Sequence, residues 1–231
     1  MLKNVERITL ILTLHYKVLL IVNMEDNNQH LDTLTEIRSL MEKSSRFISL
    51  SGLSGIFAGI FALIGAVIAY RYIESVQHYD YAYLMSGKMN AEFYLFFFLN
   101  ASFVLLASLA FGSFFTIRKA KKNNQSIWSS TSKRLLINLM IPLATGGLFC
   151  LILLQHGLIG LIAPATLIFY GLALLNASKY TLNDIRYLGI FEIILGLVGS
   201  FYIGYGLLFW AIGFGILHII YGSVMYFKYE K

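Results

Sequence analysis

The chain has 231 residues, of which 58% are hydrophobic and only 13% are charged, and its mean hydropathy is +0.70. Soluble domains carry about 25% charged residues, so this composition excludes a soluble enzyme or DNA-binding domain, and it excludes disorder, which needs low hydrophobicity. The single cysteine, Cys150, excludes an intramolecular disulfide framework and a multi-cysteine metal site. We therefore predict an integral membrane protein.

The N-terminal residues 1–23 contain an apolar run that is interrupted by His15 and Lys17. The run is shorter than the ~20 residues that a helix needs to span a bilayer. No small-x-small cleavage site of a signal peptide precedes Met24. Two interpretations stay open: residues 1–23 are an upstream extension of the reading frame with the natural start at Met24, or they form a weak interfacial segment.

Residues 24–48 are predicted to be a cytoplasmic segment with an amphipathic helix over residues 33–48. Thr33 and Glu36 have the spacing of a capping box. Apolar residues follow at intervals of three and four, beginning with Leu34, while charged residues occupy the other positions. We expect a juxtamembrane helix on the cytoplasmic leaflet, because one or two heptads are too few for a coiled coil.

Six long apolar runs fill residues 49–231, and each is near the length that crosses ~30 Å of hydrocarbon. The fold class predicted from them is all-α, a polytopic membrane protein with six transmembrane helices. The predicted spans are residues 49–70, 93–117, 135–154, 158–176, 187–204 and 207–227.

The orientation follows from the basic residues. Of the 15 Lys and Arg residues after Met24, 13 lie on one side of the predicted spans, and only Arg71 and Lys88 lie on the other. Cytoplasmic loops carry the excess of Lys and Arg, so both termini are predicted to be cytoplasmic. Basic residues placed this way orient the protein and contact anionic headgroups, so we predict no binding of nucleic acid.

Two short motifs each occur in two different predicted spans. Gly-Ile-Phe begins at residues 55 and 189, each followed by a glycine eight positions after the Phe, and an aromatic-Gly-Ser motif begins at residues 111 and 221. These matches predict three helical hairpins, formed by spans 1–2, 3–4 and 5–6 and related as parallel repeats.

The last hairpin carries a resemblance to a known family through its glycines, which are Gly189, Gly196, Gly213, Gly215 and Gly222. This pattern resembles the HdeD-like family of small bacterial membrane proteins. The resemblance implies a six-span protein of the bacterial inner membrane with a link to acid stress, and it supplies no catalytic residues.

Two stripes of small residues at four-residue spacing predict close helix packing. They are Ser51, Gly55 and Gly59 in the first span, and Gly196, Ser200 and Gly204 in the fifth. The stripes fit packing within one chain, and homodimerisation through either span is the alternative.

Glu192 is the only carboxylate well inside a predicted span, where an ionisable group is costly and marks a candidate site. A turn near residues 205–206 would bring it level with residue 219, next to His218. Two interpretations stay open for this pair: a structural hydrogen bond that holds the last hairpin, or a proton-sensitive pair in a transport or sensing route. A turn centred on His156 would likewise bring Asn138 level with residue 174, near Asn176, and this predicts an interhelical hydrogen bond between Asn138 and Asn176.

Other chemistry is weakly indicated. Glu74, His78 and Asp80 have ligand-type side chains, but their spacing is common by chance, and we predict no metal and no cofactor. Ser-His-Asp sets, phosphate loops and HExxH motifs do not occur in the sequence.

We therefore expect a non-enzymatic membrane protein with a structural, stress or assembly role. A small transporter or channel that uses Glu192 and His218 is the alternative. The expected partners are the lipid bilayer and other copies of the chain.

Overall fold

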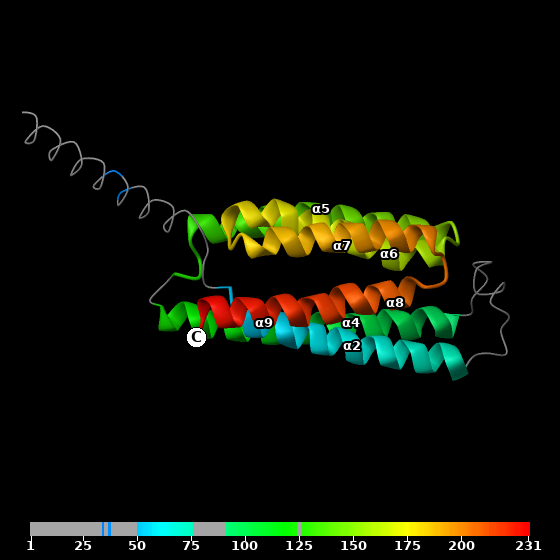
Figure 1. Ribbon diagram of the computed structural model, residues 1–231. Helices are drawn as coiled ribbons and strands as arrows, with labels where there is room; N and C mark the ends of the chain where they lie inside the picture. The colour runs from blue at the N-terminus through cyan, green and yellow to red at the C-terminus, as the bar shows by residue number, and fades with distance from the viewer. Residues whose placement is uncertain (1–33, 35–36, 38–49, 76–90, 124–125) are drawn as a thin grey trace, which may run out of the picture. The chain divides into compact units, whose positions relative to one another are not determined.

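The computed structural model describes residues 50–75, 91–123 and 126–231, together with Leu34 and Ile37 (Figure 1). The chain divides into two units, Met1–Ser45 and Arg46–Lys231. In the first unit, Leu34 and Ile37 are helical and exposed. The predictions for residues 1–23 and for the remainder of the amphipathic helix lie outside the described residues.

Every regular element within the described ranges of the second unit is helical. Among the described residues, five helical segments are long and apolar enough to cross a membrane. The elements are α2 (Gly52–Ser75), α4 (Ala91–Lys122), α5 (Ser130–Gln155), η1 (Ile159–Leu161), α6 (Ile162–Ala177), η2 (Ser178–Tyr180), α7 (Asp184–Phe201), α8 (Gly206–Trp210), the π-helical η3 (Ala211–Leu217) and α9 (His218–Tyr229). The elements η1, α6 and η2 form one continuous segment, as do α8, η3 and α9.

The helix α7 is the one predicted span that does not belong to the five. It is 18 residues long and contains Asp184, Arg186 and Glu192, so it carries more charge for its length than the others. A helix nevertheless occupies the place predicted for the fifth span, and α6 packs along it.

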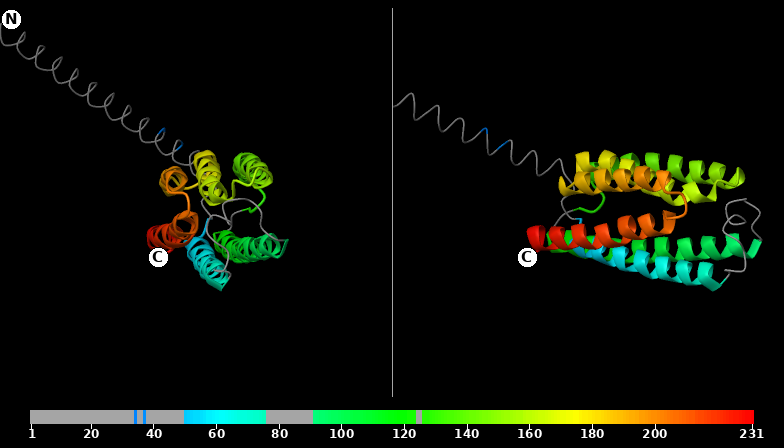
Figure 2. Two further views of the ribbon diagram at one scale, coloured as in Figure 1. Left: turned by 90° about the vertical axis from the view of Figure 1, so that its right-hand side faces the viewer. Right: turned by 45° about the vertical axis from the view of Figure 1, so that its right-hand side comes forward.

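The helices of this unit form two layers of three (Figures 1 and 2). In one layer α2 lies between α4 and α9, and in the other α6 lies between α5 and α7. The chain passes from the second layer to the first at residues 202–205, between α7 and α8. The two layers meet mainly where α6 and α7 contact the continuous segment α8–η3–α9.

The three-hairpin repeat is not confirmed by this arrangement. Sequence neighbours α2 and α4 pack together, and so do α5 and α6. The last two spans are joined by a short turn, but α7 packs mainly on α6 and α9 packs mainly on α2. The reason lies in the glycines, which allow closer backbone approach to these partners than to each other.

Glycines set the closest helix contacts in both layers. A Cβ atom on Gly59 of α2 would lie 2.6 Å from the carbonyl oxygen of Gly215, and one on Gly55 would lie 3.1 Å from the Cα of Gly222. In the other layer, a Cβ on Gly196 of α7 would lie 2.7 Å from the carbonyl oxygen of Pro164 on α6. Gly55, Gly59 and Gly196 therefore pack within the chain, against α9, η3 and α6.

Beyond Gly196, the residues of the predicted stripe on the fifth span have the following surroundings. The Ser200 hydroxyl donates to the Gly196 carbonyl of its own helix at 2.8 Å, and α7 ends at Phe201. Gly204 is exposed in the following turn with φ of 109°, a backbone conformation that residues other than glycine rarely adopt. Gly199 makes the inward contact instead, against the Phe209 ring.

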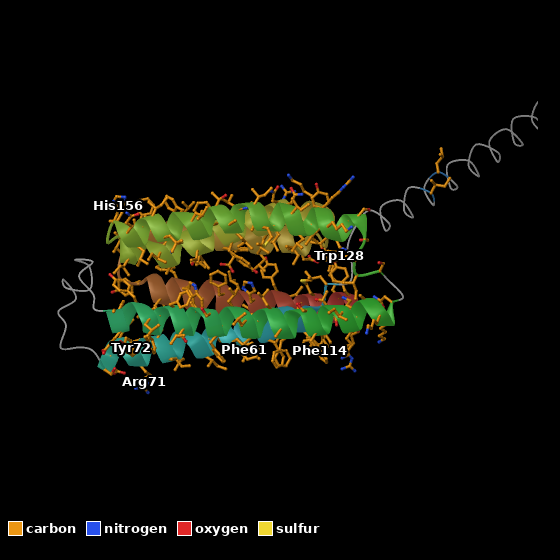
Figure 3. All side chains as sticks on the ribbon, turned by 180° about the vertical axis from the view of Figure 1, so that it is seen from behind. Phe61, Arg71, Tyr72, Phe114, Trp128 and His156 are labelled. Atoms are coloured by element: carbon orange, nitrogen blue, oxygen red, sulfur yellow. The ribbon has the colours of Figure 1, made fainter. Side chains whose placement is uncertain are left out.

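The outer helices α4 and α5 expose large apolar side chains along most of their length. An apolar surface of this extent fits contact with lipid and not with water. Figure 3 shows Arg71, Tyr72 and His156 at one end of the bundle and Trp128 at the other. The C-terminus lies at the Trp128 end (Figures 1 and 3).

Candidate functional site

Glu192 lies in the middle of α7 and is fully buried, with 0% of its surface exposed. It shares a helix face with Gly189 and Gly196, which are three positions before and four positions after it. A Cβ on Gly189 would come within 2.7 Å of the carbonyl oxygen of Gly171 on α6, so this face of α7 sits directly against α6. The close packing of small residues on both sides removes the carboxyl group from lipid.

His218 is the first residue of α9 and follows the π-helical segment η3. It is 6% exposed, and its Nδ1 atom lies 3.3 Å from Oε1 of Glu192. The structure therefore brings together the two residues that the turn arithmetic placed at one depth. They come from helices in different layers, so the pair lies at the contact between the layers.

The hydrogen bonds of His218 fix its tautomer. Nδ1 lies 3.0 Å from the Gly213 carbonyl oxygen, which can only accept, so Nδ1 carries a proton. Nε2 lies 2.8 Å from the hydroxyl of Tyr170 on α6. In the neutral ring Nε2 therefore accepts the Tyr170 proton, and in the imidazolium form Nε2 donates to the Tyr170 oxygen. The ring can thus gain a proton without losing either hydrogen bond.

The Glu192 carboxyl group is the unsatisfied member of this centre. Among the described residues, neither of its buried oxygens has a hydrogen-bond partner, and the 3.3 Å approach of His218 is an ionic contact only if the ring is charged. Leaving a buried polar group unpaired costs about 1–3 kcal/mol. A Cβ on Gly213 would lie 2.5 Å from both Oε2 of Glu192 and Cδ2 of Leu167, so any other residue there would force these buried side chains to shift.

Tyr170 belongs to this centre and was absent from the prediction. Its hydroxyl is the only ionisable group within α6 (Ile162–Ala177), and a single ionisable side chain in an apolar span is the signal that could have identified it. Phe214 closes the site on one side, with its ring centroid 4.9 Å from that of Tyr170 and 5.8 Å from that of His218. We refer to Glu192, His218 and Tyr170 as the buried centre.

The predicted contact of Asn138 with Asn176 is present in a different form. Asn176 donates to the backbone carbonyl of Asn138 at 3.4 Å, while the side chain of Asn138 donates to the Arg134 carbonyl of its own helix. Pro142 explains the geometry, because it has no N–H and so leaves the carbonyl four residues earlier without its helical donor. Asn176 of α6 supplies the missing donor.

A second polar cluster, which was not predicted from the sequence, lies at the end of the bundle that carries the C-terminus. Glu230 accepts hydrogen bonds from the backbone N–H of Gly52 and from the Ser51 hydroxyl, the latter at 3.2 Å. Lys119 of α4 donates to Glu230 at 3.3 Å and to the Leu50 carbonyl at 2.8 Å. The Lys119 and Glu230 side chains are only 10% and 14% exposed. We call these residues the terminal clamp, because they join α2, α4 and the end of α9.

In the terminal clamp, Glu230 caps the N-terminus of α2. The first N–H groups of a helix have no partner within it, and a carboxylate near them is favoured by the helix dipole. Glu230 supplies that carboxylate to α2 from the far end of the chain. A signal for it exists in the sequence: residues 50–52 have no acidic residue to cap α2, and Glu230 is the last acidic residue.

No group of three potential metal ligands occurs in the described ranges. Glu74 forms an exposed ion pair with Arg71 at 3.2 Å. His78 and Asp80 lie outside the described residues.

Comparisons with known proteins give no relative. No family model matches the chain, no curated protein matches it, and no solved structure resembles it closely enough to be matched.

Proposed function

We propose that the chain is a non-enzymatic, six-span protein of the bacterial inner membrane with both termini cytoplasmic. In this proposal it has a structural, stress or assembly role, and its buried centre binds a proton. The membrane assignment is supported by five long apolar helices and by the exposed apolar faces of α4 and α5. The sixth span is supported by the packing of α7 along α6, which buries Glu192 between helices.

The orientation is supported by the distribution of charge. Thirteen of the 15 basic residues after Met24 fall on the side assigned to the cytoplasm. The clamp residue Lys119 and the Asp184–Lys228 ion pair, at 3.1 Å, belong to that side. A reporter fused after Lys231 should therefore be active in the cytoplasm, and a reporter inserted at Lys88 should be active outside. A C-terminus found on the outer side would overturn the orientation.

One observation carries the proton-binding proposal: Glu192 is fully buried and unpaired beside a histidine whose hydrogen bonds persist in both protonation states. A group that served only as a structural hydrogen-bond partner would have its oxygens satisfied. His218 lies 3.3 Å from Glu192, and Tyr170 interacts electrostatically with the same carboxyl group. A carboxyl and an imidazole at this distance can share one proton, and its loss or gain changes the charge at the contact between the layers.

The test is infrared difference spectroscopy of the purified full chain in lipid across a pH titration. Protonation of a buried carboxyl group gives a carbonyl band that Glu192→Gln removes. The matched control is Glu74→Gln, which changes an exposed carboxylate and should leave the band intact. A band unchanged by Glu192→Gln, or no pH-dependent band at all, would contradict the proposal.

A small transporter or channel is the second candidate, and it is favoured by the position of the buried centre between the two layers. A change of charge there can move the layers relative to each other, as alternating access requires. Reconstitution into liposomes that contain a pH-sensitive dye separates the two functions. Flux in wild type that is lost in both Glu192→Gln and His218→Ala favours transport. A pH-dependent carboxyl band without flux favours a sensing or stress role.

A further inference from the structure

An open groove lies between α5 and α6, away from the buried centre. Its volume is about 430 Å³, within the range of sites that hold small molecules. It is lined on α5 by Pro142 and Thr145, and on α6 by Phe169, Leu172 and Asn176. Lys179 of η2 lies at one end of it.

The shape of the groove follows from the sequence of α5. Gly146 has no side chain, and a Cβ there would lie 2.5 Å from Cγ of Phe169, so Phe169 packs directly against α5 at this position. Pro142 leaves the Asn138 carbonyl free for Asn176, which holds the two helices together beyond the proline. The space between these two contacts remains open and is bounded mainly by apolar side chains, together with Thr145.

The polar groups of the groove gather at a single end. Lys179 donates to the Asn176 side-chain oxygen at 3.2 Å, and Asn176 is in turn held by the Asn138 carbonyl. One ammonium proton is used in this bond, and an ammonium group has three. The remaining donors of the exposed Lys179 are available to an anion. Lys133 and Arg134, at the start of α5, belong to the same end of the bundle.

An apolar groove with a cationic side chain, here Lys179, at one end has the form of a phospholipid site. The acyl chain lies on hydrocarbon side chains at bilayer depth, and the phosphate meets the ammonium group at headgroup level. On the orientation given above, this end faces the cytoplasmic leaflet, where anionic lipids lie. We propose that the groove binds one anionic phospholipid, with an acyl chain along Leu172 and Phe169 and the phosphate at Lys179.

The test is native mass spectrometry of the purified full chain in detergent, titrated with phosphatidylglycerol or phosphatidylcholine of the same acyl chains. We expect phosphatidylglycerol to bind more tightly. Lys179→Gln should reduce its affinity about fivefold, which corresponds to about 1 kcal/mol for a basic residue at an anionic surface. The matched control is Lys121→Gln, which removes an exposed cation of α4 outside the groove and should have little effect.

A second variant tests the apolar part of the site. Thr145→Trp puts an indole into the groove from an exposed position of α5, so the chain should fold and lose bound phosphatidylglycerol. Circular dichroism checks that its helices are intact. Equal binding of both lipids, equal losses in Lys179→Gln and Lys121→Gln, or undiminished binding by Thr145→Trp would each overturn the proposal. Displacement of phosphatidylglycerol by equimolar palmitate would assign the groove to free fatty acids and also overturn it.

Discussion

The buried centre and the terminal clamp each enclose a carboxylate, and they treat it in opposite ways. Glu230 receives hydrogen bonds from Gly52, Ser51 and Lys119. Glu192 is more deeply buried, and within the described structure its oxygens receive no hydrogen bond. Three donors surround the Glu230 carboxylate, whereas the buried Glu192 carboxyl group lies unpaired beside His218, which is the geometry on which the proton-binding proposal rests. The comparison separates a carboxylate that holds helices together from one that, in our proposal, binds and releases a proton.

The largest expected effect comes from breaking the clamp. Lys119→Met leaves the Glu230 carboxylate without its cation in a largely buried position, and loss of one partner from such a pair costs about 3 kcal/mol or more. Unfolding in a detergent titration should show the loss. The double variant Lys119→Met with Glu230→Gln should recover part of it, because no uncompensated charge remains. Lys121→Met, one half-turn along α4 and exposed, is the control, and an equal loss there would refute a specific clamp.

The next effect tests how tightly the buried centre is packed. Gly213→Ala introduces a methyl group against Glu192 and Leu167, and overpacking of this kind costs about 1–3 kcal/mol. The comparison is Gly147→Ala on α5, where a Cβ meets nothing within 4 Å. We expect thermal unfolding at a lower temperature for Gly213→Ala and no decrease for Gly147→Ala. Equal stability of the two variants would mean that Glu192 is not enclosed as described.

Glu-to-Gln replacement in both regions sharpens the contrast directly. Glu192→Gln should change the stability by less than about 1 kcal/mol, because it removes a charge that is costly in hydrocarbon and breaks no hydrogen bond seen among the described residues. Glu230→Gln removes the counter-ion of Lys119 and should destabilise the protein by about 2 kcal/mol. Both variants are measured in the same unfolding assay. The contrast fails if Glu192→Gln is the more damaging of the two.

The smallest expected effect is that of Tyr170→Phe. It removes the hydrogen bond to Nε2 of His218, and interhelical hydrogen bonds in membranes contribute ~0.6 kcal/mol on average. Stability should therefore change little, while the pH dependence of the Glu192 carboxyl band should shift, because His218 loses the group that accommodates its second proton. A large loss of stability with an unshifted band would make Tyr170 a packing residue.

The amino-acid sequence by itself determined the class of the protein and the places of its helices. Hydrocarbon contact demands long apolar runs, and composition alone shows them, so five of the predicted spans coincide with helices that can cross a membrane. The depth of Glu192 and His218 also followed from the sequence, because a helix rises by a constant amount per residue and a short turn fixes the register of its two arms.

Only the tertiary structure decided which helices are partners. Lipid is as apolar as a leucine side chain, so no hydrophobic force sorts one apolar helix from another, and the choice depends on the fit of small residues. Gly189 and Gly196 fit α6, and Gly222 fits α2, which separates α7 from α9 although a short turn joins them. The same fit brings Tyr170 to His218 and Glu230 to the start of α2, contacts between residues 48 and 178 positions apart that no local pattern in the sequence encodes.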